Sequence, residues 1–125
     1  MQVLDASALL AFLHGEPGTD RVRPILDGAI VSAVNWAEVI QKALRAQADV
    51  VGMGAELADM GVVIEPFTHE QAEIAAYLWQ KTRAWGLSLA DRACLALAIA
   101  KKAPVWTADR AWGALPLGID IRLLR

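Results

Sequence analysis

The chain has 125 residues, a hydrophobic content of 56% and a formal net charge of −2, which suits one compact domain with a sizeable core. Cys94 is the only cysteine, so disulfide scaffolds and a structural zinc site are excluded. The negative charge gives no overall attraction to nucleic acid, and no uncharged stretch is long enough to span a bilayer.

The chain begins Met1-Gln2-Val3-Leu4-Asp5, without the basic start and apolar stretch of a signal peptide, so we expect a soluble, cytoplasmic protein. Short β-type runs predict strands at residues 2–4, 29–32, 62–64, 105–107 and 120–123. Segments long and periodic enough to be helices lie between them. Strands that alternate with helices predict an α/β fold with a central parallel five-stranded sheet flanked by helices.

Candidate caps mark the starts of the predicted helices: Ser7, Asn35, Thr68 and Ser88. The residues Thr68-His69-Glu70-Gln71 are typical of a capping box, and they predict a helix from Thr68 to about Trp85. Glycine and proline break the chain at residues 15–18, after the first helix, and at residues 113–118, before the last strand. Neither break is long enough to be an interdomain linker.

Two aspartates lie where predicted strands end. Asp5 directly follows the first strand, and Asp109 follows the fourth strand after one intervening residue. Open α/β sheets bind their ligands at the carboxyl ends of strands. Each aspartate taken alone is better explained as the cap of the next helix, but the pair favours a site.

Asp91 lies three residues after Ser88, in the first turn of a predicted helix, where a carboxylate is favoured by the helix dipole alone. Residues 93–100 are apolar on nearly every face, so we expect this helix to be deeply buried. A carboxylate on such a helix needs a partner.

Glu38 lies in the first turn of the helix that Asn35 is predicted to cap. It could form an ordinary surface ion pair with Lys42, one turn further along. Its helix directly follows the strand at residues 29–32, however, so its first turn should also lie at the carboxyl edge of the sheet.

Together, the four carboxylates would form an all-oxygen site that suits Mg²⁺ or Mn²⁺ and does not suit zinc: Asp5, Glu38, Asp91 and Asp109. Two unit charges about 4 Å apart repel by about 4 kcal/mol at an effective dielectric of 20, so cations or shared protons must accompany the cluster. Such cations would activate water and stabilise the leaving oxygen of a phosphodiester.

Neutralising the four carboxylates changes the formal charge of the rest of the chain from −2 to +2, a mildly basic surface for RNA. Candidate phosphate contacts are Lys42, Arg45, Arg92 and Arg110.

Four motifs carry a resemblance to a known family. They are Val3-Leu4-Asp5-Ala6-Ser7-Ala8-Leu9-Leu10, Ser32-Ala33-Val34-Asn35-Trp36-Ala37-Glu38-Val39, Leu87-Ser88-Leu89-Ala90-Asp91-Arg92-Ala93-Cys94-Leu95-Ala96 and Val105-Trp106-Thr107-Ala108-Asp109-Arg110-Ala111-Trp112. In this order and approximate spacing, the chain resembles the PIN-domain toxins of the VapC type almost from end to end.

The resemblance implies a single PIN domain over residues 1–125 with endoribonuclease activity, in which the four acidic residues bind one or two Mg²⁺ or Mn²⁺ ions. It also implies that Ser7 and Thr107 support the acidic cluster, although a helix cap and a strand hydroxyl are simpler roles for them. Such toxins are usually homodimers that a cognate antitoxin holds inactive.

Five tryptophans raise the possibility of base stacking, and Trp36 and Trp112 are the candidates for RNA contact because they lie beside Glu38 and Asp109. Core or dimer contacts are the simpler role for most of the others. Cys94 is expected to be a buried small hydrophobe. His14 and His69 are expected at helix ends on the surface.

Two other readings remain open. The first is Mg²⁺-dependent aspartyl phosphotransfer, with Asp5 phosphorylated. Dehalogenase-type phosphatases need a second aspartate where this chain has Ser7, however, and the acidic pair and lysine of receiver domains are missing. The second is a catalytically silent binding module, which predicts that neutralising Asp91 leaves function unchanged.

Overall fold

The centre of the structure is one parallel sheet, seen in a computed structural model that describes residues 1–125. Its strands are β1 Val3–Leu4, β2 Ile30–Ser32, β3 Val63–Glu65, β4 Val105–Thr107 and β5 Ile121–Leu123. They lie in the order β3-β2-β1-β4-β5, and every neighbouring pair is parallel. The predicted five-stranded parallel sheet is confirmed, with each strand boundary within one residue of its predicted position.

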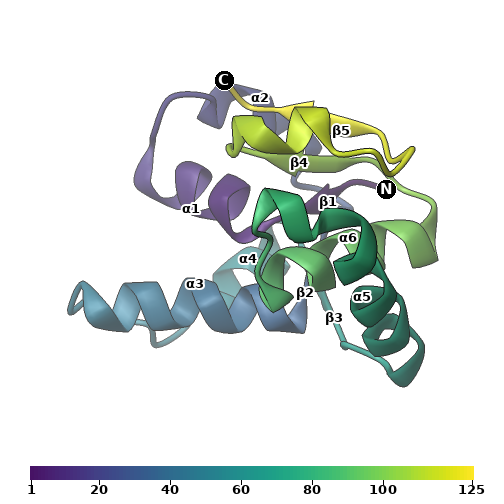
Figure 1. Ribbon diagram of the computed structural model, residues 1–125. Helices are drawn as coiled ribbons and strands as arrows, with labels where there is room; N and C mark the ends of the chain where they lie inside the picture. Colours follow the sequence, from purple (N-terminus) through teal and green to yellow (C-terminus); the bar gives the residue numbers. More distant parts are fainter.

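Helices cover both faces of this sheet (Figure 1). The α-helices are α1 Ala6–His14, α2 Thr19–Val22, α3 Ala33–Arg45, α4 Met53–Asp59, α5 His69–Thr82 and α6 Leu89–Lys101. Three 3₁₀ helices complete the chain: η1 Arg23–Ile25, η2 Arg83–Trp85 and η3 Arg110–Ala114. None of the helices is both long and apolar enough to cross a bilayer.

Successive residues of a strand point to opposite faces of a sheet, and apolar side chains of this sheet lie on both faces. Leu4, Val31 and Trp106 belong to one core cluster, with side chains from α1 to α4. Val3, Ile30 and Val105 belong to a second cluster, with side chains from α5, α6 and η3. The sheet therefore separates two cores, and its three central strands, β2, β1 and β4, are buried on both sides.

The chain leaves β1 in one direction, toward β2 and β3, whereas β4 and β5 lie on its other side. The β1–β4 boundary is thus the point where the strand order reverses, and ligands of open α/β sheets bind at the carboxyl ends of strands at such a point. The residues that directly follow β1 and β4 are Asp5 and Ala108.

The structure changes two of the predicted caps. Helix α1 is capped by Asp5 rather than Ser7, and α3 by Ser32 rather than Asn35, because each helix begins as soon as its strand ends. Thr68 and Ser88 are confirmed as caps, but the Thr68 capping box is only half formed, since no hydrogen bond returns from the Gln71 side chain. The α-helix after Thr68 ends at Thr82, and η2 continues it to Trp85, as predicted.

Candidate active site

Asp5 is the most buried of the four predicted acidic residues, with 5% of its surface exposed. Its Oδ1 accepts hydrogen bonds from the Ser7 hydroxyl at 2.7 Å and from the Ala8 backbone N–H at 2.8 Å. Its Oδ2 accepts one from the Thr107 hydroxyl at 2.6 Å. Three donors from two ends of the chain therefore fix both oxygens of the carboxylate.

Burial raises the pKa of Asp5 from its ordinary value of 3.8 to about 6. The hydrogen bonds from Thr107, Ser7 and Ala8 lower the pKa and offset part of this effect, while the nearby charge of Asp91 raises it further. The ionised form of Asp5 is therefore disfavoured at this site, and a nearby cation would stabilise it.

We expect Asp5 to make the protein more stable as the pH falls from neutral. Because the folded pKa is about 6 and the ordinary value is 3.8, the folded protein takes up this proton at a higher pH than the unfolded chain. The ionised carboxylate therefore lowers the free energy of unfolding by up to about 3 kcal/mol above the folded pKa, and this loss disappears below the ordinary pKa.

Urea unfolding of the wild type and of Asp5→Asn, in EDTA between roughly pH 7 and pH 4.5, measures this effect. Asparagine does not titrate, so groups common to both proteins cancel. The stability of the wild type relative to the variant should rise as the pH falls. A difference that stays constant across this range contradicts the raised pKa.

Asp91 occupies the first turn of α6 and closes a capping box with Ser88. The Ser88 backbone N–H donates to Asp91 Oδ2 at 3.0 Å, and the Asp91 N–H donates to the Ser88 hydroxyl at 3.0 Å. The capping role considered from the sequence is real. It uses only one carboxylate oxygen, so Asp91 Oδ1 stays free of protein hydrogen bonds.

Glu38 lies in the second turn of α3, one turn later than predicted, because the helix already begins at Ala33. The alternative ion pair with Lys42 does not form. Instead, the Asn35 side-chain amide donates to Glu38 Oε1 at 3.0 Å and to the Ala90 carbonyl at 3.0 Å. Asn35 therefore joins Glu38 to the residue that precedes Asp91.

Asn35 is a site residue that the sequence reasoning missed by treating it as a cap. Only 1% of its surface is exposed, and its Oδ1 is buried without a hydrogen-bond partner. A buried amide oxygen without a partner is unfavourable unless it faces a ligand or an ordered water molecule. Its position three residues before Glu38, on the same helix face, was the available signal.

Asp109 follows β4 and is exposed. Its Oδ1 accepts from the Ala111 N–H at 3.0 Å as the cap of η3, and its own N–H donates to the Thr107 hydroxyl at 3.0 Å. Thr107 in turn donates to Asp5. The Asp109 backbone and the Asp5 carboxylate thus bond the same hydroxyl, although the two residues are 104 positions apart in the chain.

Ser7 and Thr107 do hold hydrogen bonds at the acidic site. The Ser7 hydroxyl donates to Asp5, lies 3.3 Å from the Thr107 hydroxyl and accepts from the Ala108 backbone N–H at 2.9 Å. These contacts fix the segment after β4 to the start of α1. A positioning role for both hydroxyls is consistent with this network.

The charges of three acidic residues act on the buried thiol of Cys94. Burial first, and then the charges of Asp5, Asp91 and Glu38, raise the pKa of this thiol well above its usual range. Asp5 after β1, Glu38 on α3 and Asp91 on α6 therefore lie near enough to this thiol for their charges to act on it. As the side chains stand, however, no three of the His, Cys, Asp and Glu residues lie close enough together to hold a metal ion.

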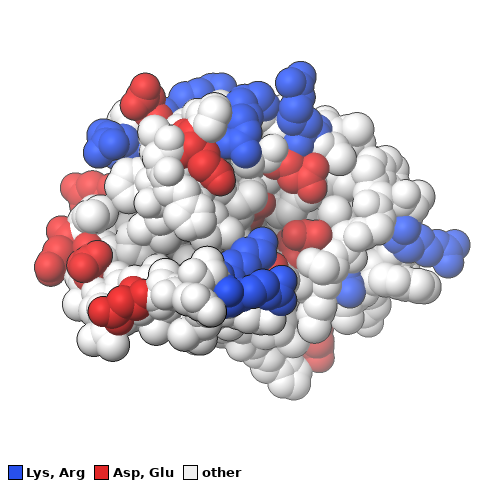
Figure 2. Space-filling model, turned by 90° about the vertical axis from the view of Figure 1, so that its left-hand side faces the viewer, with Lys and Arg blue, Asp and Glu red and all other residues white.

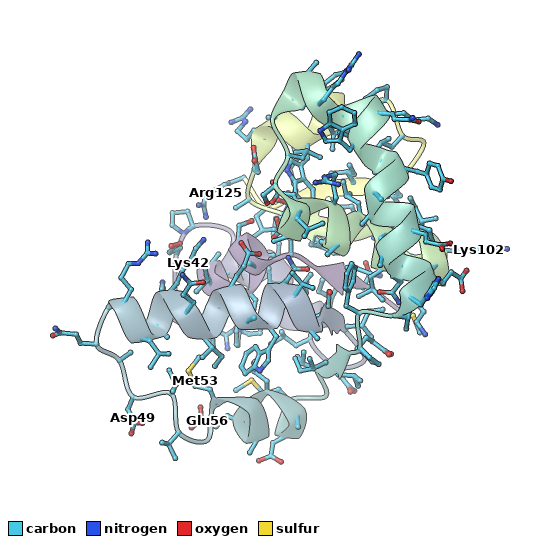
Figure 3. All side chains as sticks on the ribbon, turned by 60° about the horizontal axis from the view of Figure 1, so that its bottom comes forward. Lys42, Asp49, Met53, Glu56, Lys102 and Arg125 are labelled. Carbon is cyan, nitrogen blue, oxygen red and sulfur yellow. The ribbon has the colours of Figure 1, made fainter.

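Basic residues border this acidic centre. Figure 2 views the molecule from the side to which the strands' carboxyl ends point, and acidic side chains lie in a hollow with Lys and Arg above and below. Lys42 and Arg45 are exposed on α3, and Arg110 is exposed on η3. In Figure 3, Lys42 lies on the side of α3 away from α4, whereas Met53 lies between the two helices.

Three of the predicted RNA contacts find no support. Trp112 is 1% exposed and belongs to the second core, so contact with RNA is wrong for this residue. The Trp36 ring packs against the first core, beside Gly54 of α4. Arg92 donates to the Ala75 carbonyl of α5 at 2.8 Å, which directs its guanidinium into the α5–α6 contact. Cys94 is buried, as expected. His14 and His69 lie exposed at helix ends, also as expected.

The fold and the site together define a parallel α/β domain with an acidic site at the carboxyl edge of its sheet. The family model of the PIN domain matches residues 3–116, so the chain belongs to the PIN-domain family. This confirms the family to which the four motifs point. No curated protein sequence matches the chain significantly.

Several solved structures share the fold over their whole length. A toxin–antitoxin complex from Klebsiella pneumoniae matches with a TM-score of 0.76 and 17% identity, over 100% of this chain and 98% of that one. VapC20 from Mycobacterium tuberculosis, described as a sarcin-ricin loop cleaving toxin, matches with a TM-score of 0.76 and 15% identity, over 98% of this chain and 99% of that one. FitAcB from Neisseria gonorrhoeae matches with a TM-score of 0.71 and 19% identity, over 99% of this chain and 98% of that one.

Proposed function

We propose that this protein is an endoribonuclease that depends on Mg²⁺ or Mn²⁺ and acts as the toxin of a toxin–antitoxin pair. The observation that carries the proposal is a hydrogen-bond network that links the acidic segments at the carboxyl edge of the sheet. The Thr107 hydroxyl donates to Asp5 and accepts from the Asp109 backbone N–H. The Asn35 amide donates to Glu38 and to the carbonyl of Ala90, which precedes Asp91. PIN-family membership and the likeness to toxin structures support the same function.

The donor set fits a hard divalent cation. All four side chains offer carboxylate oxygens, which Mg²⁺ and Mn²⁺ prefer. Glu38, Asp91 and Asp109 each have one oxygen that no protein group bonds, and the buried Asn35 Oδ1 lacks a partner. The cation would supply Lewis-acid chemistry, which makes water more acidic and stabilises negative charge on the phosphate.

The chain's own residues have separate roles in this proposal. Asp5 is held rigidly by Ser7 and Thr107, so it provides a fixed anchor at the base of the site. Asn35 orients Glu38 toward the start of α6. Lys42, Arg45 and Arg110 are proposed to bind backbone phosphates around the hollow, where their contribution falls with added salt.

The burial of Asp5 counts against the phosphotransfer alternative. A phosphorylated aspartate must offer one oxygen to the incoming phosphate, but here both oxygens accept hydrogen bonds and only 5% of the residue is exposed. A role as a fixed support suits this carboxylate better than a role as a nucleophile.

The proposed partners are an RNA substrate, a cognate antitoxin and a second copy of this chain, and the proposed location is the cytoplasm. The likeness to a toxin–antitoxin complex supports the antitoxin, and the likeness to a toxin described as cleaving the sarcin-ricin loop supports the RNA substrate. The second copy and the location follow from the family resemblance alone.

Removal of divalent cations is expected to abolish cleavage. Purified protein incubated with total cellular RNA and Mg²⁺ should produce discrete new 5′ ends, and EDTA should remove them because the acidic residues then lack their cation. Excess Mg²⁺ or Mn²⁺ should restore them. Cleavage that persists in EDTA would show that the activity is independent of metal, and it would overturn this part of the proposal.

A further inference from the structure

Two tryptophans lie on the surface of the protein, and both belong to one short segment. Trp79, in α5, is 49% exposed and Trp85, at the end of η2, is 39% exposed. The other three tryptophans belong to the cores or pack against them. Exposed large apolar side chains that cluster on a surface are typical of an interaction site.

The segment that carries them, residues 79–90, is also basic. It contains Lys81 and Arg83 and no acidic residue, although the whole chain has a formal charge of −2. The Arg83 guanidinium lies over the Trp79 ring, 5.4 Å from the ring centre. This cation–π contact orders the indole and places a positive charge beside it. We call residues 79–90 the aromatic–basic segment.

The aromatic–basic segment leads directly into the candidate active site. Gly86, with φ of 67°, ends η2 in a left-handed conformation and turns the chain, so that Ser88 caps α6 and Asp91 closes its first turn. Figure 1 shows this turn between α5 and α6 on the side of the molecule to which the carboxyl ends of the strands point. Asp91 lies six positions after Trp85.

We propose that Trp79 and Trp85 are stacking platforms for unpaired bases of the RNA substrate, with Lys81 and Arg83 contacting the adjacent phosphates. This inference rests on the proposed function for the identity of the ligand. Unpaired bases stack on exposed aromatic rings, and positive groups beside them follow the backbone. Charge complementarity favours RNA, because its phosphates are attracted to Lys81 and Arg83, which no acidic residue of the segment neutralises.

Trp79 and Trp85 take the place of Trp36 and Trp112, the two tryptophans that the sequence suggested as RNA contacts. Trp36 and Trp112 neighbour acidic residues in the chain, but Trp112 is buried in the second core and Trp36 packs, partly buried, against the first. Trp79 and Trp85 are further from the acidic motifs in sequence and present their rings to solvent.

The test is the affinity of the protein for a fluorescein-labelled single-stranded RNA of mixed sequence, measured by anisotropy in EDTA at low salt. Trp79→Ala and Trp85→Ala should each raise the Kd about 5- to 100-fold, as expected for the loss of one stacked base. Trp79→Phe and Trp85→Phe keep an aromatic face and should recover much of the affinity.

Tyr77→Ala is the matched control, because Tyr77 is 72% exposed on the same helix but lies outside the aromatic–basic segment. Its Kd should stay within about twofold of the wild-type value. Thermal unfolding of every variant establishes that the fold is intact at these surface positions.

The inference is overturned if the wild type does not bind the RNA, or if the two alanine variants bind it as tightly as the wild type does. It is also overturned if they change the mass of the free protein in sedimentation but bind RNA normally, because the segment is then a protein interface. If binding depends on both tryptophans but total RNA is not cut in Mg²⁺, the proposed nuclease function fails and the stacking surface stands.

Discussion

Asp91→Asn is expected to cut RNA about 10²- to 10³-fold more slowly than the wild type in Mg²⁺, the range typical of removing one electrostatic group from an active site. The variant loses one of the three negative charges that act on Cys94. The measurement is the initial rate of cleavage of a substrate identified from the mapped 5′ ends, with calorimetric titration of Mn²⁺ to follow cation binding.

The substitution is suited to this purpose because asparagine can preserve the local structure. Its side-chain oxygen can still accept the hydrogen bond that the Ser88 N–H donates to Asp91 at 3.0 Å, so the capping box of α6 can stay closed. An unchanged melting temperature would establish this. A loss of activity would then come from the missing charge and not from a damaged helix.

Asp120→Asn is the control for the change in charge. Asp120 is exposed, pairs with Arg122 at 2.9 Å and precedes β5, at the opposite edge of the sheet. This variant should cut as fast as the wild type. If Asp91→Asn also kept the full rate, either Asp91 would not be catalytic or the activity would belong to a contaminant. If no protein cut RNA at all, the binding-module reading would gain support.

Trp112→Ala is expected to lower the free energy of unfolding by about 3–5 kcal/mol, the usual cost of removing a large aromatic side chain from a core. Trp112 is among the largest fully buried side chains, and it packs with Val105, Leu95 and Leu78 in the second core. Its removal leaves a cavity between η3, the sheet and α6 that the backbone cannot close fully. Urea unfolding of the two proteins measures this difference.

Trp112→Phe separates the role of the ring from that of its polar group. The buried Nε1 of Trp112 has no hydrogen-bond partner, so phenylalanine removes an unsatisfied donor while it keeps much of the apolar ring. We expect this variant to be more stable than Trp112→Ala. Trp85→Ala, at the surface, should cost far less than either. A small loss for Trp112→Ala would contradict its place in the core.

The positions of the strands and most helix ends could be predicted because they depend on local sequence. Runs of branched apolar residues located all five strands, and Thr68 and Ser88 located the starts of α5 and α6. Ser7 and Asn35 failed as caps for a local reason. Ser7 lies two residues after Asp5, which caps α1, and Asn35 lies three residues after Ser32, which caps α3. Within one turn the sequence thus offers more than one residue able to cap the helix.

The candidate site was only partly accessible from the sequence. Parallel strands place their carboxyl ends at one edge, which was sufficient to group Asp5 with Asp109. The role of Asn35 was not accessible, because its amide bonds the carbonyl of Ala90, 55 residues away. The direction of the Arg92 side chain was not accessible for the same reason, because its guanidinium donates to the Ala75 carbonyl on another helix, α5.

The sequence by itself determined the α/β class, the parallel sheet, the acidic residues and the family, since these follow from periodicity, chain order and short motifs. Only the tertiary structure decided which tryptophans are exposed, which carboxylate is fully buried and which hydroxyl supports it. The physical reason is that burial and side-chain hydrogen bonds join residues far apart in the chain. The bond between Thr107 and Asp5 spans 102 residues, and no local pattern encodes such a contact.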